Sequence, residues 1–178
     1  MPAKNAIKQY VENGYYHLYN RGVEKRIIFV DEQDYVTFLS YLKVYLSSKN
    51  ENELRKLFMD PNTSSKEKER IRKLLRLNNF SEEISLLAYC LMPNHFHILV
   101  RQKETNGITS FIQSLCTRYT MYFNKKYNRV GPLFQSVYKA VLVQTEEQFL
   151  HLSRYIHHQA IASQPSSYPE YLGKRKTE

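Results

Sequence analysis

At residues 91–100 the sequence reads Leu-Met-Pro-Asn-His-Phe-His-Ile-Leu-Val, and the rest of the chain is organised around this stretch. Pro93 and Asn94 predict a turn that delivers the chain into a β-strand. Because successive side chains of a strand point to opposite faces, His95 and His97 project from the same side. The strand rise places the two residues about 7 Å apart, so their imidazoles can converge on one metal ion. The stretch therefore predicts half of a metal site and directs a search for further ligands.

The bulk composition indicates one basic domain. The 178 residues suffice for one hydrophobic core but are few for two. A formal net charge of +9 and an abundance of tyrosine, 15 residues, favour a polyanionic partner such as nucleic acid. Cys90 and Cys116 form no CxxC pair, which argues against a disulfide framework or a cysteine zinc site. We find no apolar run of signal-peptide or membrane-span length, so we expect a reduced, cytoplasmic protein without membrane contact.

Strand and helix signals alternate along the first half of the chain. Residues 15–22 predict a strand that ends at a glycine turn. Residues 31–47 predict an amphipathic helix with Asp31 as its N-cap. Residues 84–91 are mostly apolar, as in a strand buried on both faces, and the Pro-Asn turn joins them in a hairpin to the histidine strand.

The second half continues the alternation. The patterns predict a helix from Ile108 that stops at the breaker residues 128–132, a strand over 136–144 and a last helix from Thr145 to about Ala162. Residues 163–178 are polar and basic, so we expect a loose tail.

A charged segment, about residues 48–82, separates the first helix from the second strand. Two short helices are expected there, over 51–59 and 66–77, with a turn-rich break between them. Nine basic and five acidic residues lie between Lys49 and Arg76. Two interpretations stay open: a solvated helical insertion, or a lobe that contacts nucleic acid.

The order of elements predicts the fold class. A β-α-β-β-α-β order is that of the α+β, ferredoxin-like split βαβ fold, an antiparallel sheet with helices on one face. Here the charged insertion interrupts it and an extra C-terminal helix follows it, within a single domain (1–178) whose core is about 15–162. The first and third strands are central in this topology, which would bring His17 and Asn20 beside the histidine pair.

The last helix offers the missing groups. Tyr155 and Gln159 lie four residues apart and border the packed side of the helix, so they stack one turn above the other. If this helix lies against the histidines, two imidazoles, an amide oxygen and a phenol meet in one place. A divalent ion held there would polarise a scissile phosphate, and the phenol would attack it to form a phosphotyrosine. Mixed nitrogen and oxygen ligands suit Mg²⁺ or Mn²⁺, the latter favoured by histidine.

Five blocks of sequence carry a resemblance to a known family. In chain order they are YHLYNRG (16–22), MPNHFHILV (92–100), RYTMYFN (118–124), GPLFQ with Tyr138-Lys139 (131–139) and RYIH (154–157). Together they span roughly residues 15–160 and resemble the IS200-like (Y1) transposases of the HUH type, including the REP-associated tyrosine transposases. The resemblance implies a metal-dependent single-strand DNA endonuclease and strand transferase. Such an enzyme recognises hairpins and forms a 5′-phosphotyrosine with a free 3′-OH.

The family's functional residues map onto this chain. The resemblance implies that His95 and His97 are metal ligands, that Tyr155 is the nucleophile and that Gln159 completes the metal site. His158 remains an alternative to Gln159 as a ligand. The REP-associated branch often has Asn-Pro after the tyrosine, whereas this chain has Gln-Ala at 159–160.

Two further tyrosines and several cations are candidates for other roles. Tyr119 and Tyr122 compete with Tyr155, but their helical phase matches that of core residues. The candidates for contacts to DNA phosphates are Arg21, Arg26, Lys125, Lys126, Arg129 and Lys139.

The expected partner is single-stranded DNA with a hairpin. A homodimer and a monomer both stay open, since related enzymes supply the tyrosine helix either to the partner subunit or to their own histidines. The competing function is a catalytically inactive or domesticated protein that binds structured single-stranded DNA on the same fold. An RNA-binding sheet of the RRM kind is disfavoured because the RNP1 pattern is missing.

Overall fold

The structure is a computed structural model that describes residues 8–159 and 164–175. Its strands are β1 (Tyr15–Arg21), β2 (Ile84–Met92), β3 (His95–Gln102) and β4 (Lys139–Val143). Its helices are a 3-10 turn η1 (Val23–Lys25), α1 (Glu32–Leu46), α2 (Glu51–Met59), α3 (Ser65–Arg76), α4 (Gly107–Lys126), α5 (Glu146–Gln159) and α6 (Tyr168–Tyr171). The predicted strand and helix order is confirmed, although β4 is shorter than expected.

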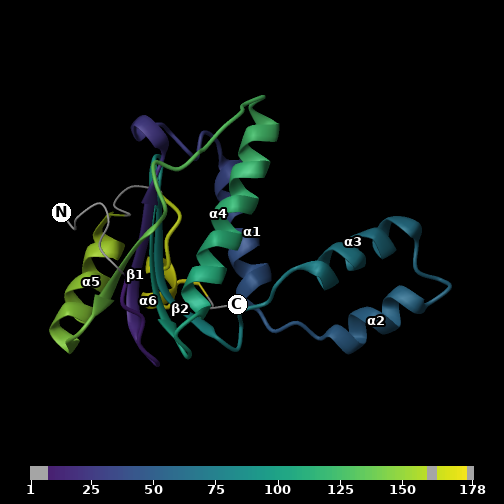
Figure 1. Cartoon of the computed structure of the whole chain (residues 1–178), viewed down its shortest axis with the longest axis horizontal. Helices are drawn as coiled ribbons and strands as arrows, with labels where there is room; N and C mark the ends of the chain where they lie inside the picture. Colours follow the sequence, from purple (N-terminus) through teal and green to yellow (C-terminus); the bar gives the residue numbers. More distant parts are fainter. Residues whose placement is uncertain (1–7, 160–163, 176–178) are drawn as a thin grey trace.

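The four strands form one antiparallel sheet in the order β2-β3-β1-β4. Figure 1 shows α1 and α4 on one face of this sheet and α5 on the opposite face. The α+β, ferredoxin-like arrangement is therefore confirmed, with β1 and β3 as its central strands. The extra C-terminal helix covers β2 and β3 from the side that α1 and α4 leave free.

Most of the hydrophobic core lies between the sheet and the α1–α4 pair. Phe38, Phe96, Phe111 and Tyr119 are fully buried there, and their rings pack against neighbouring aromatic side chains. The second cluster, between the sheet and α5, is smaller and centres on Ile156. Since apolar burial is the main favourable term in folding, stability rests on the first face.

The start of α1 is fixed by a capping box. The Asp31 side chain accepts a hydrogen bond from the Asp34 backbone N–H, and the Asp34 carboxylate accepts one from the Asp31 backbone N–H. Asp34 is fully buried and also accepts hydrogen bonds from Tyr122, Tyr127 and Lys126. This polar network ties the N-terminus of α1 to the C-terminal end of α4.

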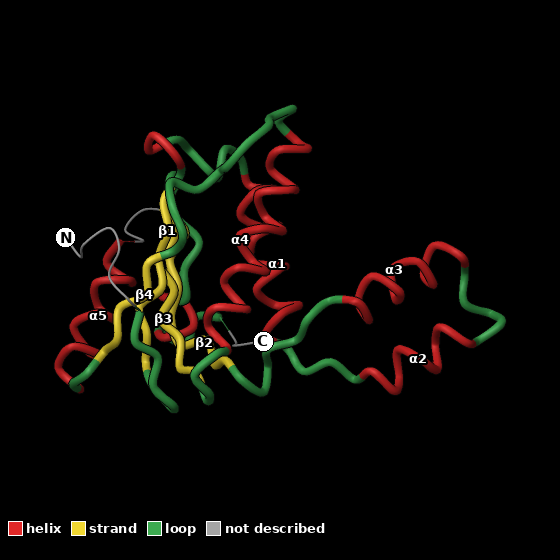
Figure 2. The backbone as a smooth tube through the Cα atoms, viewed as in Figure 1, coloured by secondary structure: helices red, strands yellow, loops and turns green. Residues whose placement is uncertain are grey.

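The charged insertion forms a helical arm. Helices α2 and α3 pack against each other, and Figures 1 and 2 show them projecting away from the sheet and from α1. Two hydrogen bonds close the base of the arm: the Asn79 side-chain amide donates to the Ser47 carbonyl, and the Lys49 ammonium donates to the Leu77 carbonyl. The two predicted helices are therefore confirmed and form a unit of their own.

The loose tail that we expected over residues 163–178 is wrong for the part that is described. Pro165 and Ser167 bond through their backbones to Leu91 and Tyr89, along the outer edge of β2. A short helix, α6, follows, and Arg175 returns to the Tyr89 hydroxyl. Backbone pairing at a sheet edge does not need apolar side chains, so a polar composition did not reveal it. The predicted end of the last helix, at Ala162, lies outside the described residues.

Candidate functional site

The histidine strand presents its imidazoles on the α5 side of the sheet. The register pairs His95 with Arg21 and His97 with Tyr19 across β3 and β1. Paired side chains share a face, and His17, two residues before Tyr19, joins them. The expectation that His17 neighbours the histidine pair is confirmed. Asn20 is directed to the other face, where its amide donates to the Ser136 carbonyl, so the same expectation for Asn20 is wrong.

The tautomer of His95 is fixed by the turn that precedes it. The Asn94 side-chain amide donates to the Lys25 carbonyl, which turns its oxygen towards His95. That oxygen lies 2.6 Å from His95 Nδ1 and can only accept, so Nδ1 carries the proton. The lone pair of His95 is therefore on Nε2, the atom that remains available to a ligand.

His97 is buried and lies between two other histidines. Its Nδ1 lies 2.8 Å from Nε2 of His17, and its ring is perpendicular to that of His95, with 4.9 Å between the ring centroids. Its Nε2 is buried and has no hydrogen-bond partner among the residues that the structure describes. Because buried polar atoms are normally paired, an orphaned imidazole nitrogen on this face fits a bound ligand such as a metal ion.

Burial keeps the three histidines neutral. It lowers the pKa of His97 to about 3, with smaller contributions from His17, His95 and Arg21, and it lowers the pKa of His17 to about 4. Burial and then the Arg21 charge lower the pKa of His95 as well. Neutral imidazole is the form that binds metals, so the electrostatics of this face suit ligation.

Helix α5 brings Tyr155 to the histidines of its own chain. The Tyr155 ring lies 5.6 Å from the His97 ring, centroid to centroid, and at 83° to it. The side chain is 40% exposed, so its hydroxyl is accessible from solvent. The next residue, Ile156, is fully buried against Ala88, Cys90 and Leu99 and anchors the helix to the sheet.

The other polar residues of α5 are less closely joined to this site. Gln159 is the last residue of the helix, one turn after Tyr155. His158 and His151 are exposed, and His157 turns away to the Ser167 hydroxyl. Among residues 8–159 and 164–175, no three His, Cys, Asp or Glu side chains gather in a metal-binding group.

The six basic candidates for phosphate contacts lie in different parts of the structure. Arg21 and Lys139 stand on the histidine face, paired in register with His95 and with Tyr19. Lys125 is exposed near the end of α4, the helix on the opposite face of the sheet. Arg21 and Lys139 therefore flank the histidines, and Lys125 does not.

The remaining three basic candidates have partners or neighbours within the protein. Lys126 forms ion pairs with Asp31 and Asp34, 2.7 and 2.8 Å long. Arg129 donates to the Asn124 side chain and to the Pro132 carbonyl. Burial lowers the pKa of Arg129, and the nearby positive charge of Arg26 lowers it further. Lys126 in particular holds the helices together.

The rival tyrosines belong to the core, as their helical phase predicts. Tyr119 is fully buried and donates to the Ile28 carbonyl, and Tyr122 donates to Asp34. Cys90 is buried and Cys116 is half-buried, and both are free thiols. These tyrosine and cysteine side chains therefore belong to the packing of the fold and not to the candidate site.

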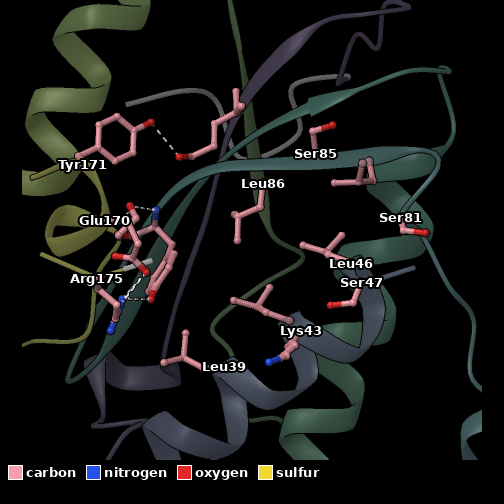
Figure 3. Close-up of a pocket in the computed structure, with 15 residues that line it drawn as sticks. Leu39, Lys43, Leu46, Ser47, Ser81, Ser85, Leu86, Glu170, Tyr171 and Arg175 are labelled. Carbon is pink, nitrogen blue, oxygen red and sulfur yellow. Dashed lines mark hydrogen bonds and ion pairs between the residues drawn. The ribbon is translucent and has the colours of Figure 1, made fainter. Parts of the chain in front are cut away.

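A cavity of about 780 Å³ lies away from the histidine face. Figure 3 shows it beside β2, with Leu39 and Lys43 of α1 on one side and Tyr171 and Arg175 on the other. None of the predicted catalytic or metal-binding residues lines it. The candidate site is thus an open face of the sheet.

Sequence reasoning missed Asn94 as a functional residue. Its position in the turn directly before His95 is visible in the sequence, but its amide is oriented by donating to the carbonyl of Lys25, which is distant in sequence.

Among the described residues, no helix has the length and apolar composition needed to cross a bilayer.

The comparisons with known proteins agree with the sequence blocks. The family model described as "Transposase IS200 like" matches residues 61–159, more than half of the chain, and leaves β1 and α1 outside the match. No curated protein matches significantly.

Two solved structures are similar at low identity. One is a REP-associated tyrosine transposase bound to a REP hairpin, with 10% identity, a TM-score of 0.46 and coverage of 98% of this chain and 77% of that one. The other, a proposed transposase from Deinococcus radiodurans, has 16% identity, a TM-score of 0.46 and coverage of 87% and 97%. These scores are too low to add to the assignment, which rests on the family model. By that match the chain belongs to the IS200-like transposase family.

Proposed function

We propose that this transposase cuts single-stranded DNA beside a hairpin by forming a covalent bond between Tyr155 and the DNA. The observation that carries the proposal is the exposed Tyr155 ring against His97, whose Nε2 is buried and unpartnered. A nucleophile beside a pair of neutral imidazoles on an open face is the arrangement that phosphoryl transfer needs.

In the proposed reaction the Tyr155 hydroxyl oxygen attacks the phosphorus. The new bond from oxygen to phosphorus forms as the bond to the 3′ oxygen breaks, which leaves a 5′-phosphotyrosine. The phenolic proton leaves, and the departing 3′ oxygen ends as a hydroxyl. Since the pKa of an unperturbed tyrosine is near 10, the phenol needs a positioned and polarised phosphate to react near neutral pH.

His95 and His97 would hold a divalent ion, Mg²⁺ or Mn²⁺, through their Nε2 atoms. Gln159 would supply an oxygen ligand, with His158 as its alternative. When bound, the ion would polarise the scissile phosphate and stabilise its developing charge. Arg21 and Lys139, on the same face, would contact the phosphates on either side.

The proposed site acts within one chain. Tyr155 already lies against His97 of its own subunit, with Ile156 seated on the same sheet, so no exchange of helices is needed. A mixture of Tyr155→Phe and His97→Ala proteins should therefore stay inactive. Recovery of activity in that mixture would show that the tyrosine serves a partner subunit.

The main experiment looks for the covalent adduct. The protein is incubated with Mg²⁺ or Mn²⁺ and a library of single-stranded oligonucleotides, each with a hairpin stem, randomised flanks and a 3′ fluorescent label. A labelled protein band on a denaturing gel is expected for the wild type and is expected to disappear in Tyr155→Phe. An adduct that survives in Tyr155→Phe would refute the choice of nucleophile.

Tyr168→Phe is a matched control, since Tyr168 is 46% exposed and lies outside the site. It should retain the adduct at the wild-type level. His97→Ala should lose the adduct but retain DNA binding. Hairpin binding by the wild type without an adduct in either metal would instead identify a binding protein that has lost catalysis.

A further inference from the structure

A third histidine of this face, His17, contacts the proposed metal site without being one of its predicted ligands. His17 comes from β1, outside the segment that the family model matches. Its Nε2 lies 2.8 Å from Nδ1 of His97, and the two rings are stacked at 23° with 5.0 Å between their centroids. Because β1 and β3 are the two central strands, this contact is held by strands that are hydrogen-bonded on both sides.

A hydrogen bond between two neutral imidazoles has a direction, and the surroundings of His97 decide it. If His17 were the donor, His97 would carry its proton on Nε2, a buried donor without a partner. If His97 Nδ1 is the donor, its Nε2 is a lone pair that faces the site. An unpaired buried donor is costly, whereas a lone pair in that position can bind a cation.

We propose that His17 is a positioning residue that accepts a hydrogen bond from His97 Nδ1 and so reserves His97 Nε2 for the metal ion. Asn94 does the same for His95 through its side-chain oxygen. The two ligands therefore have separate partners, one from the preceding turn and one from a strand distant in sequence. This inference rests on the proposed function for the presence and identity of the ion, whereas the tautomer can be measured in the metal-free protein.

The test replaces His17, the proposed hydrogen-bond acceptor. His17→Gln keeps a side-chain oxygen that can accept, whereas His17→Leu keeps bulk and removes the acceptor. Mn²⁺ affinity, measured by electron paramagnetic resonance without DNA, should fall about 10- to 100-fold in His17→Leu and largely recover in His17→Gln. Equal Mn²⁺ affinity in His17→Leu and the wild type would overturn the proposal.

A second readout does not involve metal. Long-range ¹H–¹⁵N correlation spectra of the metal-free protein should show His97 protonated at Nδ1 in the wild type and a mixture of tautomers in His17→Leu. Protonation at Nε2 in the wild type would refute the proposal even if Tyr155 forms an adduct. Conversely, a protein that binds no Mn²⁺ but shows the Nδ1 tautomer would refute the metal-dependent function and leave the role of His17 intact.

An independent observation concerns the arm formed by α2 and α3. Its segment from Lys49 to Arg76 has nine basic and five acidic residues, so it holds a large share of the chain's net charge of +9. Ile71 is buried against α2, which directs the opposite side of α3 to solvent. Figure 1 shows this arm standing clear of the body of the protein.

The outer side of α3 is a basic face. Lys66, Arg70 and Lys73 follow one another at helical spacing, with Arg72 and Arg76 beside them, and all five side chains are exposed. Two acidic residues lie among them: Glu67 pairs with Arg70, and Glu69 pairs with Arg72 and Lys73. Lys66 and Lys73 are about 10 Å apart along the helix, roughly three phosphate steps of a DNA strand.

We infer that the basic face of α3 binds the phosphate backbone of the duplex stem of the hairpin. This surface deepens the proposed function, because it gives the double-stranded part of the DNA a contact separate from the cleavage site. The complementary charge and the clear approach to the arm favour a duplex over another protein as its partner. Bases are not read by such a contact, so it would strengthen binding without selecting a sequence.

The test measures how salt weakens binding to a hairpin. In the triple variant Lys66→Gln, Arg70→Gln, Lys73→Gln the slope of log K against log salt should become shallower by about 2 to 3, about 0.9 for each lost contact. A control variant removes the same charge elsewhere, through Lys25→Gln, Lys103→Gln and Lys174→Gln, which are exposed residues outside the arm.

The two variants separate a specific face from a general effect of charge. Equal slopes in the two would refute the arm as a binding surface. Binding to an oligonucleotide without a stem should be alike in both. The salt slope reports binding and not cleavage, so absence of the covalent adduct in the wild type would bear on the proposed function only.

Discussion

The position of Tyr155 depends on one buried residue of α5, and Ile156→Ala tests that dependence. Ile156 is fully buried, and its neighbours on the sheet are the small residues Ala88 and Cys90 together with Leu99. Truncating a buried isoleucine to alanine costs about 2–5 kcal/mol. We expect about 3 kcal/mol here, because Phe149 on the same helix remains to fill part of the space.

That loss acts on the docking of α5 more than on the rest of the fold. A change of about 3 kcal/mol alters the ratio of docked to undocked helix by about two orders of magnitude. The adduct yield of Ile156→Ala should therefore fall strongly at temperatures where the protein is still folded. Hydrogen exchange should accelerate in α5 and remain slow in α4.

Ile112→Ala provides the matched control. Ile112 is equally buried but lies in the large core on the opposite face. Urea denaturation should show a comparable loss of global stability, while α5 stays protected and the adduct yield per folded molecule stays near that of the wild type. If the two variants lose the adduct equally, packing of Ile156 does not position the nucleophile and the reasoning fails.

Three further predictions concern the scaffold. Asp34→Asn removes a buried carboxylate that pairs with Lys126 and should lower the free energy of unfolding at pH 7 by about 3 kcal/mol in urea titrations. Burial tends to raise the pKa of Asp34, but hydrogen bonds led by that of Lys126 outweigh it and lower the pKa below 3.8. The carboxylate therefore stabilises the fold above its unfolded pKa and stops doing so as the pH falls through the lower folded value. The difference between wild type and variant should shrink below about pH 4, and a constant difference down to pH 2 would contradict this. A Cβ at Gly22 would lie 2.3 Å from the Arg26 carbonyl oxygen, so Gly22→Ala should lower the melting temperature, and an unchanged value would refute the close approach. In the wild type, amides of α5 should exchange faster than those of α4 because the cluster beneath α5 is the smaller of the two, and equal rates would contradict this.

The sequence predicts those features that depend on periodicity and neighbours. Alternation along residues 95–101 correctly predicts a shared face for His95 and His97, and helical phase separates the core Tyr119 from the exposed Tyr155. Topology then predicts the approach of His17. These inferences succeed because a period of two or of 3.6 is set by the backbone itself.

Partners distant in sequence are not predicted by such patterns. Lys126 is one basic residue among many until the fold places it against Asp31 and Asp34. The pairing of Pro165 with Leu91 uses backbone atoms, which leave no trace in composition. The expectation for Asn20 failed for a different reason: it lies three residues after His17 on β1, so strand alternation places the two side chains on opposite faces.

The division of the sheet into two faces explains how a polar site coexists with a stable fold. The face towards α1 and α4 contains nearly all of the large buried aromatic residues, and burial there supplies the main stabilisation. The opposite face is thereby free to hold three neutral imidazoles, Arg21 and an exposed tyrosine, none of which adds much apolar burial. Helix α5 packs on this face through Ile156 and a few neighbours. A larger cluster under α5 would stabilise the protein but would cover the face that holds the proposed site.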